Sequence, residues 1–339
     1  MVSLSLPKNT ATPSEGIRPV NLRTDLAPLA DLIEMVFADS MDSSGRAAVR
    51  EMRYLSRMGP GLGVLAGMND LKQGISLGYV WIADGRLVGN VSIYPANYPS
   101  ELGKAWIIAN VAVHPDYRGR GIARRLMQTS MESIQQRARG RKAIAVLQVE
   151  ADNHKARRLY QTLGYTDERG FTQWRRGSTL RQPLAPAHAP YITRLRRGEW
   201  REEFALAARV RPASAGGVGW LRPLHRGLFH RSVFGRFGDF FNLRSMERLI
   251  IRSQDERQIH AALWIENGFA STTTQLTLMT DTDFQGYYDD ALINLAVRRF
   301  GARSPIAIEH PSDETVTNAV LERYHFYPQR HLVHMRWES

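Results

Sequence analysis

The chain of 339 residues is 43% hydrophobic and 9% aromatic, which supplies two domains with their own cores and is too apolar for a disordered chain. It contains no cysteine, so disulfides, thiolate metal sites and cysteine nucleophiles are excluded. The formal net charge of +12 favours anionic ligands, which include nucleic acids, membrane surfaces and phosphorylated small molecules.

The N-terminal segment predicts no targeting signal. Residues 1–16 lack both a basic start and a long apolar core, and no later stretch approaches the ~18 apolar residues of a membrane span. We therefore expect a soluble cytoplasmic protein, with residues 1–16 as a flexible leader and no membrane partner.

The first half of the chain predicts strands and helices in alternation. Two β-rich runs within 78–95 are joined by Asp84-Gly85, a strong signal for a hairpin. Apolar periodicity predicts the other elements. They are a strand at 16–22, helices at 26–39 and 45–58, a strand at 105–113, a helix at about 121–139, a strand at 143–149, a helix ending near Gly164, and a strand pair around 171–176.

A proline-rich segment divides the chain. Residues 181–190, RQPLAPAHAP, have the composition of a semi-rigid linker, so we predict one domain at 17–180 and another at 191–339. Beyond the linker the order of strands and helices repeats, which predicts two copies of one α/β plan with a mixed sheet. Residues 211–242 fit no regular period and are expected to form a long functional loop or a lid.

An Arg/Gly motif lies between the strand at 105–113 and the helix that follows it. Residues 111–127 read VAVHPDYRGRGIARRLM, and Gly121 opens the helix. The first N–H groups of a helix have no internal partners and lie at the positive end of its dipole, so this junction is suited to an anion. Gly119 and Gly121 leave the backbone accessible, and Arg118 and Arg120 add positive charge. The expected ligand is a pyrophosphate.

Two common phosphate loops do not fit the motif. A Walker loop needs Lys-Ser/Thr after its second glycine, where this chain has Ile122-Ala123. A dinucleotide fingerprint needs a third glycine at the position of Arg124.

A second motif lies about thirty residues downstream. Residues 153–165 read NHKARRLYQTLGY, with Asn153 suited to capping a helix and Tyr160 on or beside its apolar face. In this order and spacing, Arg118-x-x-Gly121-x-Ala123 and Asn153-x-x-Ala156-x-x-Leu159-Tyr160 resemble the motifs of the GNAT superfamily of acyl-CoA-dependent N-acyltransferases. The resemblance covers residues 17–177, and the tandem arrangement looks like that of mycothiol synthase and its relatives.

The resemblance implies acetyl-CoA as the cosubstrate and no metal. The pantetheine arm would pair with the strand at 111–113 where two central strands splay apart after a bulge, and the pyrophosphate would contact the backbone N–H groups at 118–123. A backbone N–H of Val111 or a neighbour would polarise the thioester carbonyl. The residues implied in cofactor binding are Val111, Ala112, Val113, Arg118, Gly119, Arg120, Gly121, Ile122, Ala123, Asn153 and Tyr160.

The resemblance also implies an acid, whereas the base stays open. Tyr160 matches the phenol that protonates the sulfur of coenzyme A, a role that suits a group with a pKa near 10. Many relatives place a glutamate on the strand at 106–113, where this chain has only Asn110 as a polar side chain. Glu150 is therefore the first candidate base. The alternatives are Asp152, Glu51, His114 and a water relay with no single base.

The second copy lacks these features. Its corresponding loop, MTDTDFQGYYDDAL, has one glycine and four aspartates, which would repel a pyrophosphate. Aligning Phe326 with Tyr165 places Leu321 at the position of Tyr160, and Glu314 at that of Asn153. We expect a degenerate domain that helps to shape the acceptor pocket.

These features predict an N-acetyltransferase that acts on a primary amine of a small molecule, as a monomer or a homodimer. A protein or peptide N-terminus is an alternative acceptor, and an acyl-CoA-binding regulator without turnover is an alternative class. A nucleic-acid binder is disfavoured, because no recognisable element interleaves basic and aromatic residues.

Overall fold

The structure is a computed structural model that describes residues 15–38, 41, 43–57, 78–186, 189–230, 244–268 and 272–339. Its contacts divide the chain into two compact units. The first unit comprises 1–97, 103–147 and 337–339, and the second comprises 98–102 and 148–336. The proline-rich segment at 181–190 lies inside the second unit. The two copies predicted along the sequence and the two units formed in space are therefore different divisions of the chain.

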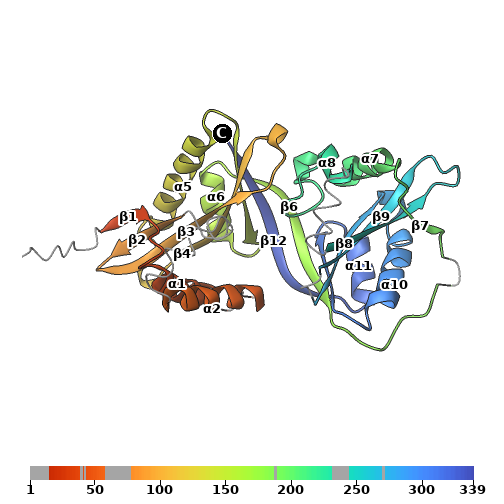
Figure 1. The fold of residues 1–339 in the computed structure, drawn as a ribbon, viewed down its shortest axis with the longest axis horizontal. Helices are drawn as coiled ribbons and strands as arrows, with labels where there is room; N and C mark the ends of the chain where they lie inside the picture. The colour runs from red at the N-terminus through yellow and green to blue at the C-terminus, as the bar shows by residue number, and fades with distance from the viewer. Residues whose placement is uncertain are drawn as a thin grey trace, which may run out of the picture. The chain divides into compact units, whose positions relative to one another are not determined.

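The first unit is a five-stranded sheet with helices on both faces (Figure 1). Its strands are ordered β1-β2-β3-β4-β5, antiparallel except for the parallel pair β4 and β5. Helices α1 and α2 cover one face and α5 covers the other. The elements are β1 (Gly16–Pro19), α1 (Leu26–Phe37), α2 (Ser43–Arg57), β2 (Tyr79–Ala83), β3 (Arg86–Ala96), β4 (Lys104–Val113), η3 (Pro115–Tyr117), α5 (Ile122–Ala138) and β5 (Ala143–Glu150), whose last three residues belong to the second unit.

Local sequence sets the main features of this unit. The β2–β3 turn is the predicted Asp84-Gly85 pair, and both residues have positive φ (50° and 69°), as a two-residue hairpin turn of this hand requires. Helix α5 packs close to β3 at Gly89. A side chain at this position would clash with the helix, because its Cβ would lie 2.9 Å from Cγ2 of Ile122. This glycine therefore fixes the start of α5 against the sheet.

The second unit repeats the plan with seven strands. They are ordered β12-β6-β11-β10-β9-β8-β7, and the apolar cores lie on the two faces of this sheet. Helices α7 and α8 cover one face, and α10 and α11 cover the other (Figure 1). The elements are α6 (His154–Thr162), β6 (Thr166–Arg176), β7 (Ile192–Arg194), α7 (Trp200–Val210), α8 (Arg226–Phe229), β8 (Arg244–Arg252), β9 (Ile259–Gly268), β10 (Thr274–Thr280), η5 (Thr282–Phe284), α10 (Tyr288–Phe300), β11 (Ile306–Pro311), α11 (Thr315–Arg323) and β12 (Tyr327–Glu338).

One expected element is wrong. The sequence predicts a strand pair around 171–176, but β6 is a single strand of 11 residues that pairs with β11 on one side and β12 on the other. Both partners come from the C-terminal half of the sequence. Conversely, the chain ends inside the first unit, where Ser339 N donates to Ala143 O at 3.0 Å. A strand's partners depend on contacts that local periodicity does not record.

The predicted repeat is present in backbone detail. After α6, Tyr165 N donates to Tyr160 O at 3.1 Å, and after α11, Phe326 N donates to Leu321 O at 3.0 Å. Gly164 (φ 88°) and His325 (φ 60°) occupy the equivalent left-handed positions between them. The two halves thus end their corresponding helices with the same turn, as the alignment of Phe326 with Tyr165 requires.

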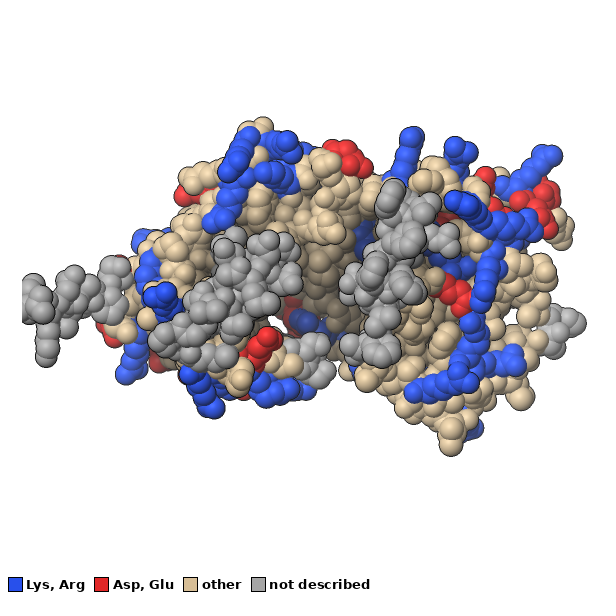
Figure 2. Space-filling view, in the orientation of Figure 1, with Lys and Arg blue, Asp and Glu red and all other residues tan. Residues whose placement is uncertain are grey.

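Basic side chains are numerous on the surface. On the face drawn in Figure 2, Lys and Arg are scattered, with Asp and Glu between some of them, and they do not gather into a single stripe. Among the described residues, no helix combines the length and apolarity that crossing a membrane requires.

Candidate functional site

Strand β4 is distorted where the sequence predicts the cofactor strand. Its pairing with β3 shifts register between Ala109 and Ala112, opposite Asn90 and Ser92, so β4 carries an extra residue there. Asn110 adopts φ 50°, and its carbonyl accepts a hydrogen bond from Nδ2 of Asn90 at 2.9 Å. A bulge of this kind turns the backbone groups that follow it, here those of Val111 to Val113.

The bulge coincides with the end of pairing between the two parallel strands. β4 pairs with β5 only from Lys104 to Ile107, opposite 143–146. Within the described part of the chain, no strand pairs with 108–113 on that side of β4. A row of backbone groups is therefore available for an extended ligand, in the manner of strand addition at a sheet edge.

The loop after β4 has the geometry of an anion site. A 3-10 turn, η3, leads to Gly119 and Gly121, both with φ 77°, and Gly121 is the N-cap of α5. A Cβ at either glycine would meet nothing within 4 Å, so these glycines are required by backbone conformation and leave open space above the loop. Among the described residues, the backbone N–H groups of 119–123 donate to no acceptor.

The loop's arginines are exposed and partly held by the loop itself. Arg118 donates from Nε to the Val113 carbonyl at 3.2 Å, which leaves its terminal nitrogens available. Arg120 donates to the Asp116 carbonyl at 3.0 Å, and its guanidinium lies 4.7 Å from the centre of the Tyr117 ring. Both cations lie next to the open backbone N–H groups, which suits a phosphate ligand.

The second motif lies in the other unit. Asn153 caps α6, its Oδ1 accepting a hydrogen bond from Ala156 N at 3.1 Å, as the sequence predicts. Tyr160 is 7% exposed, and burial raises its pKa to about 12. Within the described chain its hydroxyl has no hydrogen-bond partner, so at neutral pH it is a protonated phenol available to a ligand.

The candidate bases differ in their surroundings. Glu150 Oε1 accepts from Nε and Nη2 of Arg330, both at 2.7 Å, so its carboxylate is ion-paired. Glu51 and Asp152 have exposed side chains. His114 Nδ1 accepts a hydrogen bond from Asp116 N at 3.3 Å, which commits that nitrogen to holding the loop. Geometry alone therefore ranks none of them as the base.

In the second copy an aspartate occupies the anion position. The loop between β10 and α10 contains η5 and Gly286 (φ 86°), which parallels η3 and its glycines. Here Gly286 N donates to Oδ2 of Asp289 at 2.9 Å, and Thr317 donates to the same oxygen at 2.6 Å. Asp289 is fully buried. The chain's own carboxylate thus takes the backbone donor that a phosphate would need.

An arginine fills the second copy's strand gap. β10 pairs with β11 only from Thr274 to Leu276, so these strands splay as β4 and β5 do. Two residues beyond that point, the Leu278 carbonyl accepts from Nη2 of Arg211 at 3.0 Å. The guanidinium also pairs with Glu314, the N-cap residue of α11. Arg211 is 1% exposed and lies where a pantetheine arm would run in the first copy.

Sequence reasoning missed Arg211, because it lies in the segment 211–242 with no regular period. The only available signal was Glu314 at the position of Asn153, an acid at a helix start that needs a cation. The rest of that segment includes residues 231–243, which lie outside the described residues, so the predicted lid is not described there.

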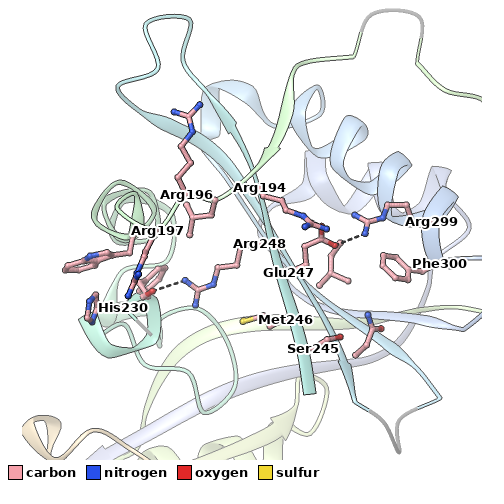
Figure 3. Close-up of a pocket in the computed structure, with 15 residues that line it drawn as sticks. Arg194, Arg196, Arg197, His230, Ser245, Met246, Glu247, Arg248, Arg299 and Phe300 are labelled. Carbon is pink, nitrogen blue, oxygen red and sulfur yellow. Dashed lines mark hydrogen bonds and ion pairs between the residues drawn. The ribbon is translucent and has the colours of Figure 1, made fainter. Parts of the chain in front are cut away.

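A further pocket of about 850 Å³ lies in the second unit, against β8 (Figure 3). Several arginines line it, but carboxylates neutralise most of them. Arg194 and Arg299 both pair with Glu247, at 2.9 and 2.7 Å. Arg248 pairs with Glu203 at 2.8 Å. No predicted site residue lines this pocket.

The described side chains include no group of three or more His, Asp or Glu arranged to hold a metal ion.

The predicted site residues fall into two sets. One set, at 111–123, forms a continuous backbone surface in the first unit. The other, Asn153, Tyr160 and Glu150, belongs to the second unit.

Comparisons with known proteins give the same fold. Residues 61–165 match the model of the acetyltransferase (GNAT) family, whereas no curated protein matches the chain. A GCN5-related N-acetyltransferase from Sphaerobacter thermophilus is 15% identical, with a TM-score of 0.57 over 95% of both chains. The GCN5-related glucosamine N-acetyltransferase region of a fungal multi-domain GH3 β-N-acetylglucosaminidase is 13% identical, with a TM-score of 0.55 over 98% of this chain and 40% of that one. A tandem GNAT protein from the clavulanic acid biosynthesis pathway is 15% identical, with a TM-score of 0.48 over 95% of this chain and 98% of that one.

The matched residues include β4, the Arg/Gly loop, α5 and the second motif up to Tyr165. The chain thus contains a GNAT acetyltransferase family region at 61–165, and its described fold is similar to that of a solved GCN5-related N-acetyltransferase.

Proposed function

We propose that the protein transfers an acetyl group from acetyl-CoA to a primary amine of a small molecule. The observation that carries the proposal is the backbone surface at 108–123. In the described part of the chain, 108–113 has no partner on the β5 side, and this segment leads through a bulge into a glycine-opened helix whose first N–H groups are unengaged. A pantetheine arm needs an extended row of backbone groups, and a pyrophosphate needs clustered N–H donors next to cations. This surface supplies both in the right order along the chain.

The first chemical task is to polarise the thioester. The amine attacks the carbonyl carbon and negative charge develops on the carbonyl oxygen. A backbone N–H at Val111 is suited to stabilise that charge, because Val111 lies inside the bulge, between the paired residues Ala109 and Ala112, and the register pairs no β3 residue with it. Removing one such donor in other enzymes costs ~2.7–4 kcal/mol of the barrier.

Tyr160 is proposed to assist the departing sulfur. Burial raises the pKa of its phenol to about 12, so it is protonated at all physiological pH values. Such a phenol is a weaker acid than a thiol, so full proton transfer to the departing thiolate would be uphill. Tyr160 therefore stabilises the sulfur by donating a hydrogen bond, and the proton that finally neutralises the thiolate comes from the attacking nitrogen.

Acetyl-CoA binding by the loop is tested with Gly121→Glu. A carboxylate at this position would occupy the open space and repel the pyrophosphate. Gly140→Glu is the matched control, because Gly140 lies beyond the other end of α5 with φ 75° and nothing within 4 Å of its Cβ position. Each change costs ~1–2 kcal/mol for a side chain in the left-handed region.

In isothermal titration with acetyl-CoA, we expect binding to the wild type and to Gly140→Glu, and none to Gly121→Glu. Absence of binding to the wild type, or equal binding by both variants, would refute the cofactor site. Release of free thiol from acetyl-CoA over a panel of primary amines then tests turnover. Binding with no thiol release for any amine would favour an acyl-CoA-binding regulator.

A further inference from the structure

Three polar side chains lie together at the bulge of β4. Asn90 and Ser92 come from β3 and Asn110 comes from β4, and the three are called here the bulge cluster. Asn90 and Ser92 are fully buried, and a buried polar side chain is stable only where its groups are hydrogen-bonded. All three residues belong to the first unit, as does the Arg/Gly loop. None of them is among the predicted site residues.

The amide of Asn90 has a fixed orientation. Its Nδ2 donates to the Asn110 carbonyl at 2.9 Å, and because a backbone carbonyl can only accept, the nitrogen must be the atom that faces it. Oδ1 is therefore turned elsewhere, and among the described residues it has no hydrogen-bond partner. The hydrogen bonds that Asn90 makes with its side chain are thus those of the nitrogen.

The hydrogen bond to Asn110 acts on the next residue through the peptide plane. The Asn110 carbonyl and the Val111 N–H belong to one planar unit, and no described peptide bond is cis. In a trans unit these two groups point in opposite directions. Holding the carbonyl toward Asn90 therefore directs the Val111 N–H away from Asn90. Because the β3 register pairs no residue with Val111, regular strand pairing does not set this direction.

Ser92 and the Asn110 side chain support the same arrangement. Nδ2 of Asn90 and Nδ2 of Asn110 both lie 3.3 Å from Ser92 Oγ, and a hydroxyl oxygen has two lone pairs that can accept them. The Asn110 side chain is thereby tied to β3 while its backbone keeps φ 50°. Asparagine is one of the few residues besides glycine that adopt this left-handed conformation readily. The bulge is thus held both at its carbonyl and at its side chain.

We propose that Asn90 is a positioning residue for acetyl transfer. Its Nδ2 holds the Asn110 carbonyl and so orients the Val111 N–H, the group proposed to stabilise the charge on the thioester oxygen. Asn90 acts through this peptide unit and does not touch the substrate. The inference rests on the proposed function, because it takes acetyl-CoA as the cosubstrate and Val111 as the donor. A donor that is already oriented needs no reorganisation during the reaction, which is what makes such donors effective.

The first test is Asn90→Leu, which keeps the branched shape of the side chain and removes its donor. We expect kcat to fall about tenfold or more, less than the roughly 10²–10³-fold lost when such a donor is removed outright. The Kd for coenzyme A, which carries no acetyl carbonyl, should change less than twofold in isothermal titration, and this shows that the variant is folded.

Ser130→Ala is the matched control. Ser130 is also fully buried in the first unit, and its Oγ donates to the Leu126 carbonyl at 2.8 Å, within α5. The change removes one buried side-chain donor to a backbone carbonyl, as Asn90→Leu does, but away from the bulge. It should change kcat less than twofold. Equal losses of kcat in the two variants would indicate that Asn90 has a structural role alone.

Asn90→Asp tests the donor itself. Aspartate has the shape of asparagine, and only its protonated form can donate to the Asn110 carbonyl. Burial favours the protonated form of a carboxyl, so the kcat of Asn90→Asp relative to the wild type should rise as the pH falls from about 8 to about 6. The same ratio for Asn90→Leu should stay constant. If Asn90→Asp is as slow as Asn90→Leu at every pH, the donor role is overturned.

A second measurement observes the peptide unit directly. Asn-Val occurs twice in the sequence, at 90–91 and 110–111, so ¹³C′ labelling of Asn with ¹⁵N labelling of Val gives signals from two peptide bonds. Val91→Ile removes one signal and assigns the other to Asn110 and Val111. In Asn90→Leu the Asn110 ¹³C′ resonance should move upfield, because its hydrogen bond is lost. An unmoved resonance would overturn the proposal.

The wild type alone supplies a further check on the direction of the donor. At saturation, the Val111 ¹⁵N–H signal should differ between the acetyl-CoA complex and the coenzyme A complex, because only acetyl-CoA places a carbonyl against this group. Identical signals in the two complexes would overturn the proposed orientation.

The two proposals fail separately. If the wild type binds no acetyl-CoA, or releases no thiol with any amine, the proposed function fails and the role of Asn90 in transfer fails with it. If an amine is acetylated, a kcat of Asn90→Leu within twofold of the wild type would overturn the positioning role and leave the proposed function standing.

Discussion

Neutralising Glu314, the buried partner of Arg211, should strongly lower the free energy of unfolding. Glu314 is 8% exposed and pairs with both Arg211 and Arg169, the latter at 2.8 Å. Burial alone would raise the pKa of Glu314, but the His310 ring, 3.0 Å away, and the charge of Arg211 lower it to about 2. Because its folded-state pKa lies below the ordinary value of 4.5, ionised Glu314 stabilises the folded state.

The size of the effect follows from that difference. A carboxyl whose pKa falls from 4.5 to about 2 on folding contributes about 3 kcal/mol at neutral pH. This is an upper value, because burial lowers the pKa of His310 and its ring contributes charge only at acid pH. The stability is fully present above about pH 5 and is lost as the pH falls toward 2. Glu314→Gln should therefore cost about 3 kcal/mol at pH 7, and about 1 kcal/mol less at pH 3.5.

The assay is urea unfolding followed by tryptophan fluorescence at the two pH values. Asp313→Asn is the matched control, because this neighbouring carboxylate also contacts Arg169 but is 66% exposed, and should cost less than ~1 kcal/mol. The double variant Arg211→Met/Glu314→Leu should be more stable than Glu314→Gln, because it removes the buried Arg211 cation together with its partner, and Arg169 keeps its contact with Asp313. A cost of Glu314→Gln equal to that of Asp313→Asn, or independent of pH, would refute the reasoning.

Three further outcomes are expected. Titration with acetyl-CoA should give one site per chain, because Asp289 and Arg211 fill the equivalent positions of the second copy, and a stoichiometry of two would contradict this. Tyr160→Phe should lower kcat ~10²-fold or more with acetyl-CoA affinity kept, and the wild-type pH–rate profile should show no loss from Tyr160 ionisation below about pH 11, since its pKa is about 12. If Glu150 is the base, Glu150→Gln should lower kcat/KM ~10²-fold, whereas Arg330→Met, which removes its ion-pair partner, should lower it less than tenfold. Equal losses in those two variants would indicate a structural ion pair.

The cofactor loop was predictable because its geometry is local. Strand end, proline, two glycines and an apolar helix face follow one another within 111–127, and each has its conformational preference wherever it occurs. Helix α5 accordingly begins at Ile122, one residue after the glycine predicted to open it. The repeat was predictable for the same reason, since the turns after α6 and α11 are set by a few consecutive residues.

A polar cluster around Glu309 on the sheet of the second unit shows what local patterns cannot supply. Its members lie at 148, 173, 220, 309 and 334, and each alone is an ordinary polar or aromatic residue in a strand or loop. Only the pairing of Glu309 with Gln173 across β11 and β6, and the approach of the Trp220 backbone, bring the carboxylate and the imidazole together.

The sequence by itself determined the repeated α/β plan, the phosphate-type loop of the first copy and its loss in the second, because these depend on residues close together in the chain. The tertiary structure alone decided the partners of β6, the division into two units, the filling of the second copy's strand gap by Arg211 and the environment of Glu309. Those features depend on contacts between residues far apart in the sequence, where burial and pairing outweigh local preference.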